Sequence, residues 1–178
     1  MQSERVFRIG EKMISLDKAI RLVERVMELR EQGISQQEAA KRLHLDRSFV
    51  SRLETIGEIR KGNRVAVIGF PLANTDQLSD ICRAYGLDFY LLLNNQERWD
   101  MVRDQQALDF FNRMFELVAR LREFDTLIII SSERWYHLAE ALLDIQIISI
   151  NLGATPIRED CFIDPECLIN NIELVIAR

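Results

Sequence analysis

Apolar residues in the first third of the chain recur every three or four positions, which is the spacing of an amphipathic helix. The first such run covers residues 16–32 and is followed by Gly33, a residue type that often terminates helices. Two shorter runs follow, over residues 35–43 and 46–53. We therefore predict that the first third is helical, with three consecutive helices.

The second and third helices begin with capping residues. The four residues from Ser35 to Glu38 read Ser-Gln-Gln-Glu, which is a capping box. In this motif the serine hydroxyl accepts a hydrogen bond from the third helical amide, and the glutamate carboxylate accepts one from the serine amide. Asp46 is the predicted N-cap of the third helix.

Beyond Gly62 the pattern changes to short apolar runs separated by amphipathic stretches. Four runs are apolar on both faces, as buried parallel strands are: residues 65–69, 89–93, 126–130 and 145–150. The intervening helices are predicted over residues 75–85, 96–124 and 133–143, with a last one from about Pro165 to the end. This order predicts a small doubly wound, mainly parallel α/β domain of about four strands.

The junction of the second and third helices has the residue types of a helix-turn-helix. Ala39 and Ala40 are small enough for two helices to approach closely. The apolar residues expected to wedge the two helices together are Leu43, Leu45, Val50 and Leu53. Residues 36–55, QQEAAKRLHLDRSFVSRLET, resemble the helix-turn-helix of the lambda-repressor and Cro-like family. They resemble the helix-turn-helix of plasmid-partition proteins equally well.

His44 departs from this resemblance, because such families usually carry glycine at that turn position. We expect a positive φ there, which histidine tolerates better than a β-branched residue does. We interpret His44 as an exposed turn residue, and a ligand or pH-sensing role is the alternative.

The resemblance implies that the third helix lies in the major groove of double-stranded DNA. The residues implied to contact bases are Asp46, Arg47, Ser48, Ser51 and Arg52. Phosphate contacts are expected from the basic residues Lys41, Arg42, Arg60 and Lys61. Phe49 either touches a thymine methyl group or packs in the core. The alternative for the whole motif is a packed helical subdomain whose arginines are solvated, or a motif used for protein contacts.

Charge is divided along the chain in the way this interpretation needs. Residues 1–62 hold 13 basic and 10 acidic residues, whereas the remainder holds 10 and 18, within a total net charge of −5. A basic part on an acidic body is typical of a protein that binds DNA through one domain. We therefore assign residues 1–58 to a helix-turn-helix DNA-binding domain and residues 63–178 to a Rossmann-like α/β domain that dimerises or binds an effector.

Polar, uncharged residues follow the predicted strands. They are Asn74, Thr75, Asn94, Ser131, Ser132 and Asn151. Ligands of doubly wound sheets bind beyond the carboxyl ends of the strands, so these residues are candidates for a small-molecule site. They are equally the ordinary caps and turn residues of βα loops.

The chain has no pattern typical of catalysis or of a bound cofactor. The G-x-G-x-x-G dinucleotide fingerprint, the phosphate loop, the nucleophile elbow and the common metal motifs are all missing from the sequence. The three cysteines form no C-x-x-C pair, and His137 stands alone in the second domain. We predict no enzyme activity, no cofactor and no metal.

We expect a cytoplasmic protein that is not associated with a membrane, because we find neither a secretory signal nor a membrane-spanning run. The predicted function is that of a transcriptional regulator that binds double-stranded DNA as a homodimer and has a small-molecule effector as a further partner. The apolar residues within 96–124 belong either to a dimer contact or to the domain core. The alternative functions are a nucleotide- or small-molecule-binding enzyme with an accessory helix-turn-helix, and a DNA-organising or partition-type factor.

Overall fold

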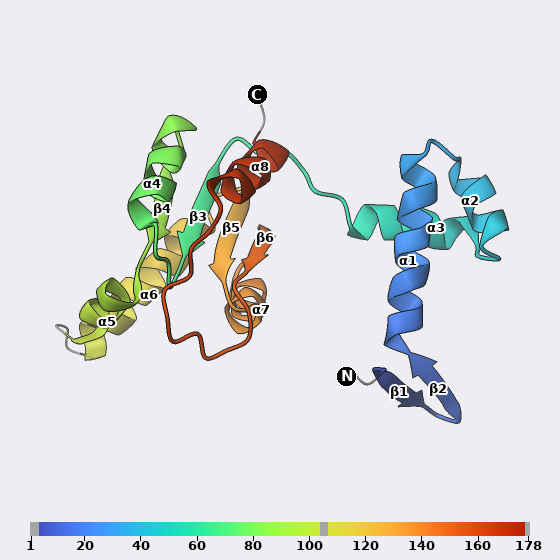
Figure 1. The fold of residues 1–178 in the computed structure, drawn as a ribbon, viewed down its shortest axis with the longest axis horizontal. Coiled ribbons are helices and arrows are strands. Elements are labelled where there is room, and N and C mark those ends of the chain that lie inside the picture. Colours follow the sequence, from blue (N-terminus) through green and yellow to red (C-terminus); the bar gives the residue numbers. More distant parts are fainter. Residues whose placement is uncertain (1–3, 104–106, 177–178) are drawn as a thin grey trace. The chain divides into compact units, whose positions relative to one another are not determined.

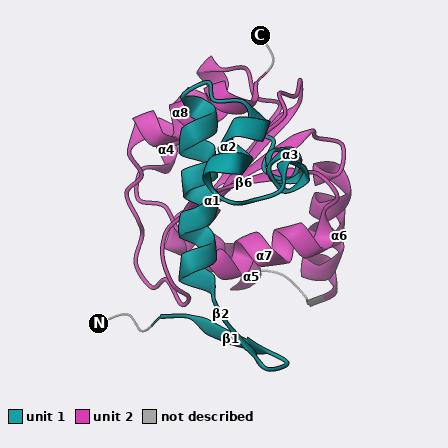
Figure 2. Ribbon diagram, turned by 90° about the vertical axis from the view of Figure 1, so that its right-hand side faces the viewer, with its two compact units in different colours: residues 1–58 teal, residues 59–178 magenta. Residues whose placement is uncertain are grey.

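The computed structural model describes residues 4–103 and 107–176, in two compact units that divide between Glu58 and Ile59 (Figures 1 and 2). We call residues 1–58 unit 1 and residues 59–178 unit 2. Each unit has its own buried core. No helix of the described ranges is both long and apolar enough to cross a membrane.

Unit 1 begins with an antiparallel hairpin of β1 (Val6–Ile9) and β2 (Lys12–Ser15). This hairpin corrects the prediction that the first third is entirely helical. The apolar side chains of the hairpin are exposed on both faces. The two strands therefore lack the alternation of apolar and polar residues that marks a strand with one buried face. Asp17, in the first turn of α1, anchors the hairpin by accepting hydrogen bonds from the amide of Arg5 at 3.0 Å and from its guanidinium at 3.1 Å.

Three helices follow, as predicted: α1 (Leu16–Glu31), α2 (Gln36–Arg42) and α3 (Arg47–Ile56). They surround a small core whose buried residues are Val26, Ala40 and Val50, one from each helix. Leu43, Leu45 and Leu53 pack against this core. The apolar residues that the sequence pattern assigned to helix contacts therefore lie between the helices.

Unit 2 is built on a parallel sheet of four strands, which confirms the predicted strands and their direction. The strands are β3 (Val65–Gly69), β4 (Phe89–Leu92), β5 (Thr126–Ser131) and β6 (Gln146–Asn151). Their order across the sheet is β4-β3-β5-β6. The chain therefore leaves β3 toward one edge and returns to the other side of it at β5, so the topological switch point lies between these two central strands.

Alternate residues of the strands form two cores, one on each face of the sheet. On one face, Val67 and Ile130 pack with α4 (Thr75–Ala84) and α8 (Pro165–Val175). On the other face, Ile68 and Ile129 pack with α6 (Ala107–Leu121) and α7 (Glu133–Leu142). Helices thus cover both faces (Figure 1), which is why these strands are apolar throughout.

The predicted single helix over residues 96–124 is instead two helices, α5 (Asn95–Arg103) and α6. α5 buries none of its side chains completely, whereas α6 packs Leu117, Val118 and Leu121 against the sheet. The long amphipathic stretch is therefore divided between a helix that packs on the sheet and a helix without a buried face.

The chain enters unit 2 through a segment held by the side chains of Asp125, which precedes β5, and of Gln146, the first residue of β6. The carboxylate of Asp125 accepts hydrogen bonds from the amides of Asn63 at 2.8 Å and Arg64 at 3.0 Å. The side chain of Gln146 accepts from the Arg60 amide at 2.7 Å and donates to the Arg60 carbonyl at 2.9 Å. Arg60 and Lys61, two of the predicted phosphate contacts, thus lie in unit 2 and not in unit 1.

Candidate nucleic-acid interface and apolar pocket

The start of α2 has one half of the predicted capping box. The hydroxyl of Ser35 accepts a hydrogen bond from the amide of Glu38 at 3.2 Å. The carboxylate of Glu38 accepts instead from Nε of Arg42 at 2.9 Å, and this hydrogen bond lowers the pKa of Glu38. Arg42, a predicted phosphate contact, is thus paired with a neighbour one helical turn away.

The turn between α2 and α3 depends on His44, whose φ of +56° confirms the expected left-handed conformation. In this conformation the amide of Leu45 donates a hydrogen bond to the carbonyl of Ala40 at 2.8 Å. The amide of His44 donates one to the carbonyl of Lys41 at 3.3 Å. These two bonds form a Schellman motif, which satisfies carbonyl groups at the end of α2. The side chain of His44 is exposed, so it meets no steric obstacle. Its backbone is strained, because an L-residue is less stable than glycine in the left-handed region.

One side of α3 is exposed and polar. The predicted base contacts Arg47, Ser48, Ser51 and Arg52 are all solvent-exposed, and Val50 on the other side is fully buried. Within the described ranges, neither arginine side chain makes an ion pair or a hydrogen bond. Both guanidinium groups therefore have their five donors available to a partner of opposite charge.

The remaining predicted DNA contacts differ in their surroundings. Asp46 is exposed at the N-cap of α3, as predicted, but its carboxylate makes no capping hydrogen bond. Lys41 is exposed on α2, and no ion pair involves it in the described part of the chain. Phe49 is 42 % exposed and lies outside the core cluster of unit 1, so it is on the surface of the helix.

Sequence reasoning missed the polar cluster that joins the three helices of unit 1. The carboxylate of Glu54 in α3 accepts hydrogen bonds from the guanidinium of Arg30 in α1 and from the side-chain amide of Gln36 in α2, the latter at 2.7 Å. The bond from Arg30 is the main cause of the lowered pKa of Glu54. These residues are far apart in sequence and have no motif in common, so no local pattern predicts their contact.

In unit 2, two of the candidate ligand residues use their side chains inside the fold. The amide of Asn74 donates to the carbonyl of Ile163 at 2.9 Å, and its oxygen accepts from the Ile163 amide at 3.1 Å. Asn94 caps α5, because its side-chain oxygen accepts from the amide of Glu97 at 2.8 Å. Both residues are thus structural in the described fold.

The other candidates lie at the ends of β5 and β6 and at the start of α4. Ser132 accepts a hydrogen bond from the hydroxyl of Thr155 at 2.7 Å, and Asn151 accepts one from the amide of Gly153 at 2.8 Å. Thr75 is the half-buried first residue of α4. Ser131 is 2 % exposed, and its hydroxyl is the one buried side-chain polar atom without a partner in the described ranges.

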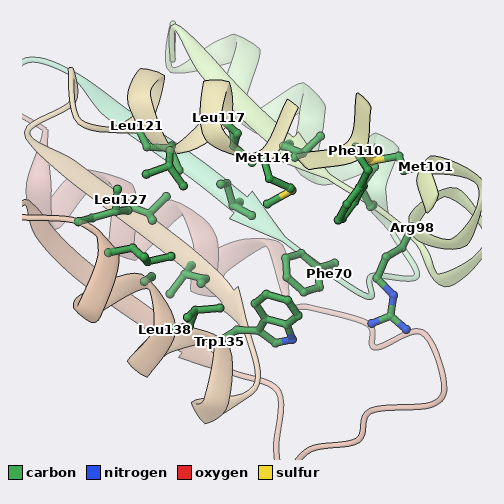
Figure 3. A pocket seen from close by; sticks show the side chains of 18 of the residues that line it. Phe70, Arg98, Met101, Phe110, Met114, Leu117, Leu121, Leu127, Trp135 and Leu138 are labelled. Atoms are coloured by element: carbon green, nitrogen blue, oxygen red, sulfur yellow. The ribbon is translucent and has the colours of Figure 1, made fainter. Parts of the chain in front are cut away.

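A cavity of about 400 Å³ lies on the other face of the sheet from α4 and α8, between the strands and α5, α6 and α7 (Figure 3). None of the six polar candidates lines it. Its walls include Phe70, Met114, Trp135 and Leu138, and Arg98 is the one charged residue among the described residues that line it. The apolar excess of residues 96–124 is visible in the sequence, but the cavity is not, because a pattern along one segment does not show how two helices are spaced.

Other chemistry is sparse in the described part of the chain. It contains no cluster of three or more histidine, cysteine or acidic side chains that could hold a metal ion. Cys82 is buried in the core, and this burial raises the pKa of its thiol to about 11. A thiol with so high a pKa is a poor nucleophile at neutral pH.

Comparison with protein-family models, with curated proteins and with solved structures finds no match to this chain.

Proposed function

We propose that this chain is a sequence-specific transcriptional regulator that binds double-stranded DNA through α3, as a helix-turn-helix protein. The observation that supports this most directly is the polar face of α3. Ser48, Ser51 and Arg52 are exposed at the spacing i, i+3 and i+4, so they project from one side of the helix. Arg47 extends this face at the first turn, and the opposite side is held in the core by Val50.

The two arginines of this face suit base recognition. A guanidinium group donates two parallel hydrogen bonds to O6 and N7 of guanine, which is the commonest specific contact in the major groove. Arg47 and Arg52 are not engaged by acidic side chains within the described ranges, so binding DNA breaks no existing ion pair. Lys41 on the preceding helix forms no ion pair with any described residue and suits a phosphate contact.

We further propose that the protein acts as a homodimer through unit 2. Helix-turn-helix proteins usually bind two half-sites as dimers, so a second copy must contact the first. On α6, Leu108, Phe111 and Phe115 are 70 %, 61 % and 69 % exposed, and the rings of the two phenylalanines lie 6.3 Å apart. Three large apolar side chains on one exposed stripe favour burial against a partner surface.

A selection from random double-stranded DNA fragments tests the function. We expect the full chain to enrich one short inverted repeat whose half-sites are about 10 base pairs apart, as a two-fold symmetric dimer requires. Equal recovery of all fragments indicates a DNA-organising factor instead. Failure to retain any fragment at low salt contradicts both functions and favours a protein in which unit 1 contacts other proteins.

A further inference from the structure

The cavity of unit 2 has the size and lining of a small-molecule site. Its volume of about 400 Å³ lies within the range of roughly 300–1,000 Å³ that ligand pockets occupy. Nearly all of its walls are apolar, from strand residues such as Leu127 and Ile129 to the helix residues Met114 and Leu138. An occupant must therefore be largely aliphatic or aromatic.

Arg98 adds one positive charge to these apolar walls. Its side chain is half-buried and donates a hydrogen bond to Asn95 at 2.7 Å. The nearest acids of its helix are engaged elsewhere, since Glu97 accepts from the Asn94 amide and Asp100 accepts from Gln96. Within the described ranges, no carboxylate forms an ion pair with Arg98, so its charge is available to an occupant.

The position of the cavity in the fold agrees with a ligand site. Phe70 comes directly after β3, and Trp135 lies in the first turn of α7, directly after β5. Figure 3 shows the guanidinium of Arg98 at the same end of the cavity as these two rings. This end is therefore at the carboxyl edge of the sheet, beside the switch point between β3 and β5, where doubly wound sheets bind ligands.

We infer that this cavity binds a small amphipathic anion, a molecule with an aliphatic or aromatic body in the apolar space and one carboxylate end on Arg98. The partly buried guanidinium pairs with a carboxylate through charge-assisted hydrogen bonds, which are stronger than neutral ones. This site does not depend on the proposed function, and its test measures ligand binding in the absence of DNA.

The chain carries its own reporter for this site. It has two tryptophans, Trp99 and Trp135, and both line the cavity. We expect decanoate, added to the full chain below its micelle-forming concentration, to change the tryptophan emission in a saturable way. 1-Decanol, which has the same alkyl chain and no charge, should bind more weakly.

Two variants separate the charge from the apolar space. Arg98→Gln should weaken decanoate binding by about tenfold or more, because a charge-assisted bond is lost, and should leave the affinity for 1-decanol nearly unchanged. Arg103→Gln is the matched control, since this arginine is exposed on the same helix and does not line the cavity. It should bind both compounds like the parent chain.

A cavity-filling variant tests the location. Ala139→Leu adds bulk to the wall and should abolish the binding of both compounds, provided that circular dichroism and thermal unfolding show a folded protein. Decanoate binding that is unchanged in both Arg98→Gln and Ala139→Leu places the ligand elsewhere and overturns the inference. A parent chain that sediments as a dimer and shows no response to decanoate also overturns it, and indicates that a second copy fills the apolar space.

Discussion

The guanidinium of Arg30 in α1 donates a hydrogen bond to the carboxylate of Glu54 in α3, 24 residues further along the chain. Each side chain is 29 % exposed. The same arginine donates to the carbonyl of Ile34, and Glu54 also accepts from Gln36. This cluster therefore connects α1, the α1–α2 loop, α2 and α3, and helps to fix the orientation of α3 relative to the other two helices.

We predict that Glu54→Gln destabilises unit 1 by about 1 kcal/mol, because the partly exposed ion pair with Arg30 is lost. Hydrogen exchange at the amides of α1 and α3 measures this loss locally. Glu31→Gln is the control, since Glu31 is exposed at the end of α1 and forms no ion pair within the described ranges. Equal exchange rates in the two variants contradict the prediction.

The same pair predicts a pH dependence of stability. The pKa of Glu54 is lowered in the folded chain, chiefly by the hydrogen bond from Arg30 and next by that from Gln36. Its contribution to stability is therefore full above the ordinary glutamate pKa of about 4.3 and is lost as the pH falls through the lower pKa of the folded state. Thermal unfolding between pH 6 and 3 should show a steeper loss for the parent chain than for Glu54→Gln.

Substitutions of His44 test the strain of the turn between α2 and α3. Its φ of +56° lies in the left-handed region, which costs an L-residue roughly 1–2 kcal/mol relative to glycine. We predict that His44→Gly preserves or raises the unfolding temperature and that His44→Val lowers it, because a β-branched residue tolerates this region least. A lower unfolding temperature for His44→Gly indicates that the imidazole makes a stabilising contact in solution.

If α3 lies in the major groove, substitutions of its arginines should change base preference, whereas substitution of Lys41 should change only the overall affinity for DNA. Arg47→Ala or Arg52→Ala should relax base preference and cost about 1–3 kcal/mol on the selected site if the residue contacts a guanine. Lys41→Ala should weaken binding to all sequences alike and reduce the salt dependence by about one counterion. Arg25→Ala, which removes a cation paired with Glu28 on α1, serves as the control. Arginine variants that retain the full base preference contradict the assignment of α3 to the groove.

Ser131, the last residue of β5, and Ser132, which follows it, form a matched pair for stability. The hydroxyl of Ser131 is buried and unpartnered, whereas that of Ser132 accepts a hydrogen bond from Thr155. We predict that Ser131→Ala stabilises the fold or leaves it unchanged, because a buried unpaired hydroxyl is unfavourable. Ser132→Ala should cost about 1 kcal/mol through loss of the Thr155 bond. Chemical denaturation of both variants measures the difference, and a destabilised Ser131→Ala indicates a hydrogen-bond partner in solution.

The exposed stripe of α6 predicts the oligomeric state. Phe115 is 69 % exposed, so Phe115→Glu should leave the fold intact while placing a charge in the proposed dimer contact. Sedimentation should show a dimer for the parent chain and a shift toward monomer for the variant. A monomeric parent chain contradicts the dimer, although it does not affect the assignment of the DNA-binding face.

Local pattern was sufficient to predict most of the elements. The Ser35 cap and the left-handed turn at His44 depend on residues close together in sequence. The strands are recognisable because a strand buried on both faces is apolar throughout. The short hairpin of β1 and β2 was not predictable in this way, since neither strand buries a face. The order of the four strands also required the structure, because a βα pattern is compatible with more than one arrangement.

The sequence by itself determined which residue types follow each strand, and therefore where polar groups gather at the carboxyl edge of the sheet. Only the tertiary structure decided how those groups are used. The side-chain amide of Asn74 forms two hydrogen bonds with the backbone of Ile163, which is 89 residues away. It is therefore engaged within the fold. The apolar cavity beside Arg98 and the contact between Arg30 and Glu54 likewise join segments that are distant in sequence. Such contacts depend on how helices pack over a sheet or over one another, which no periodicity along a single segment encodes.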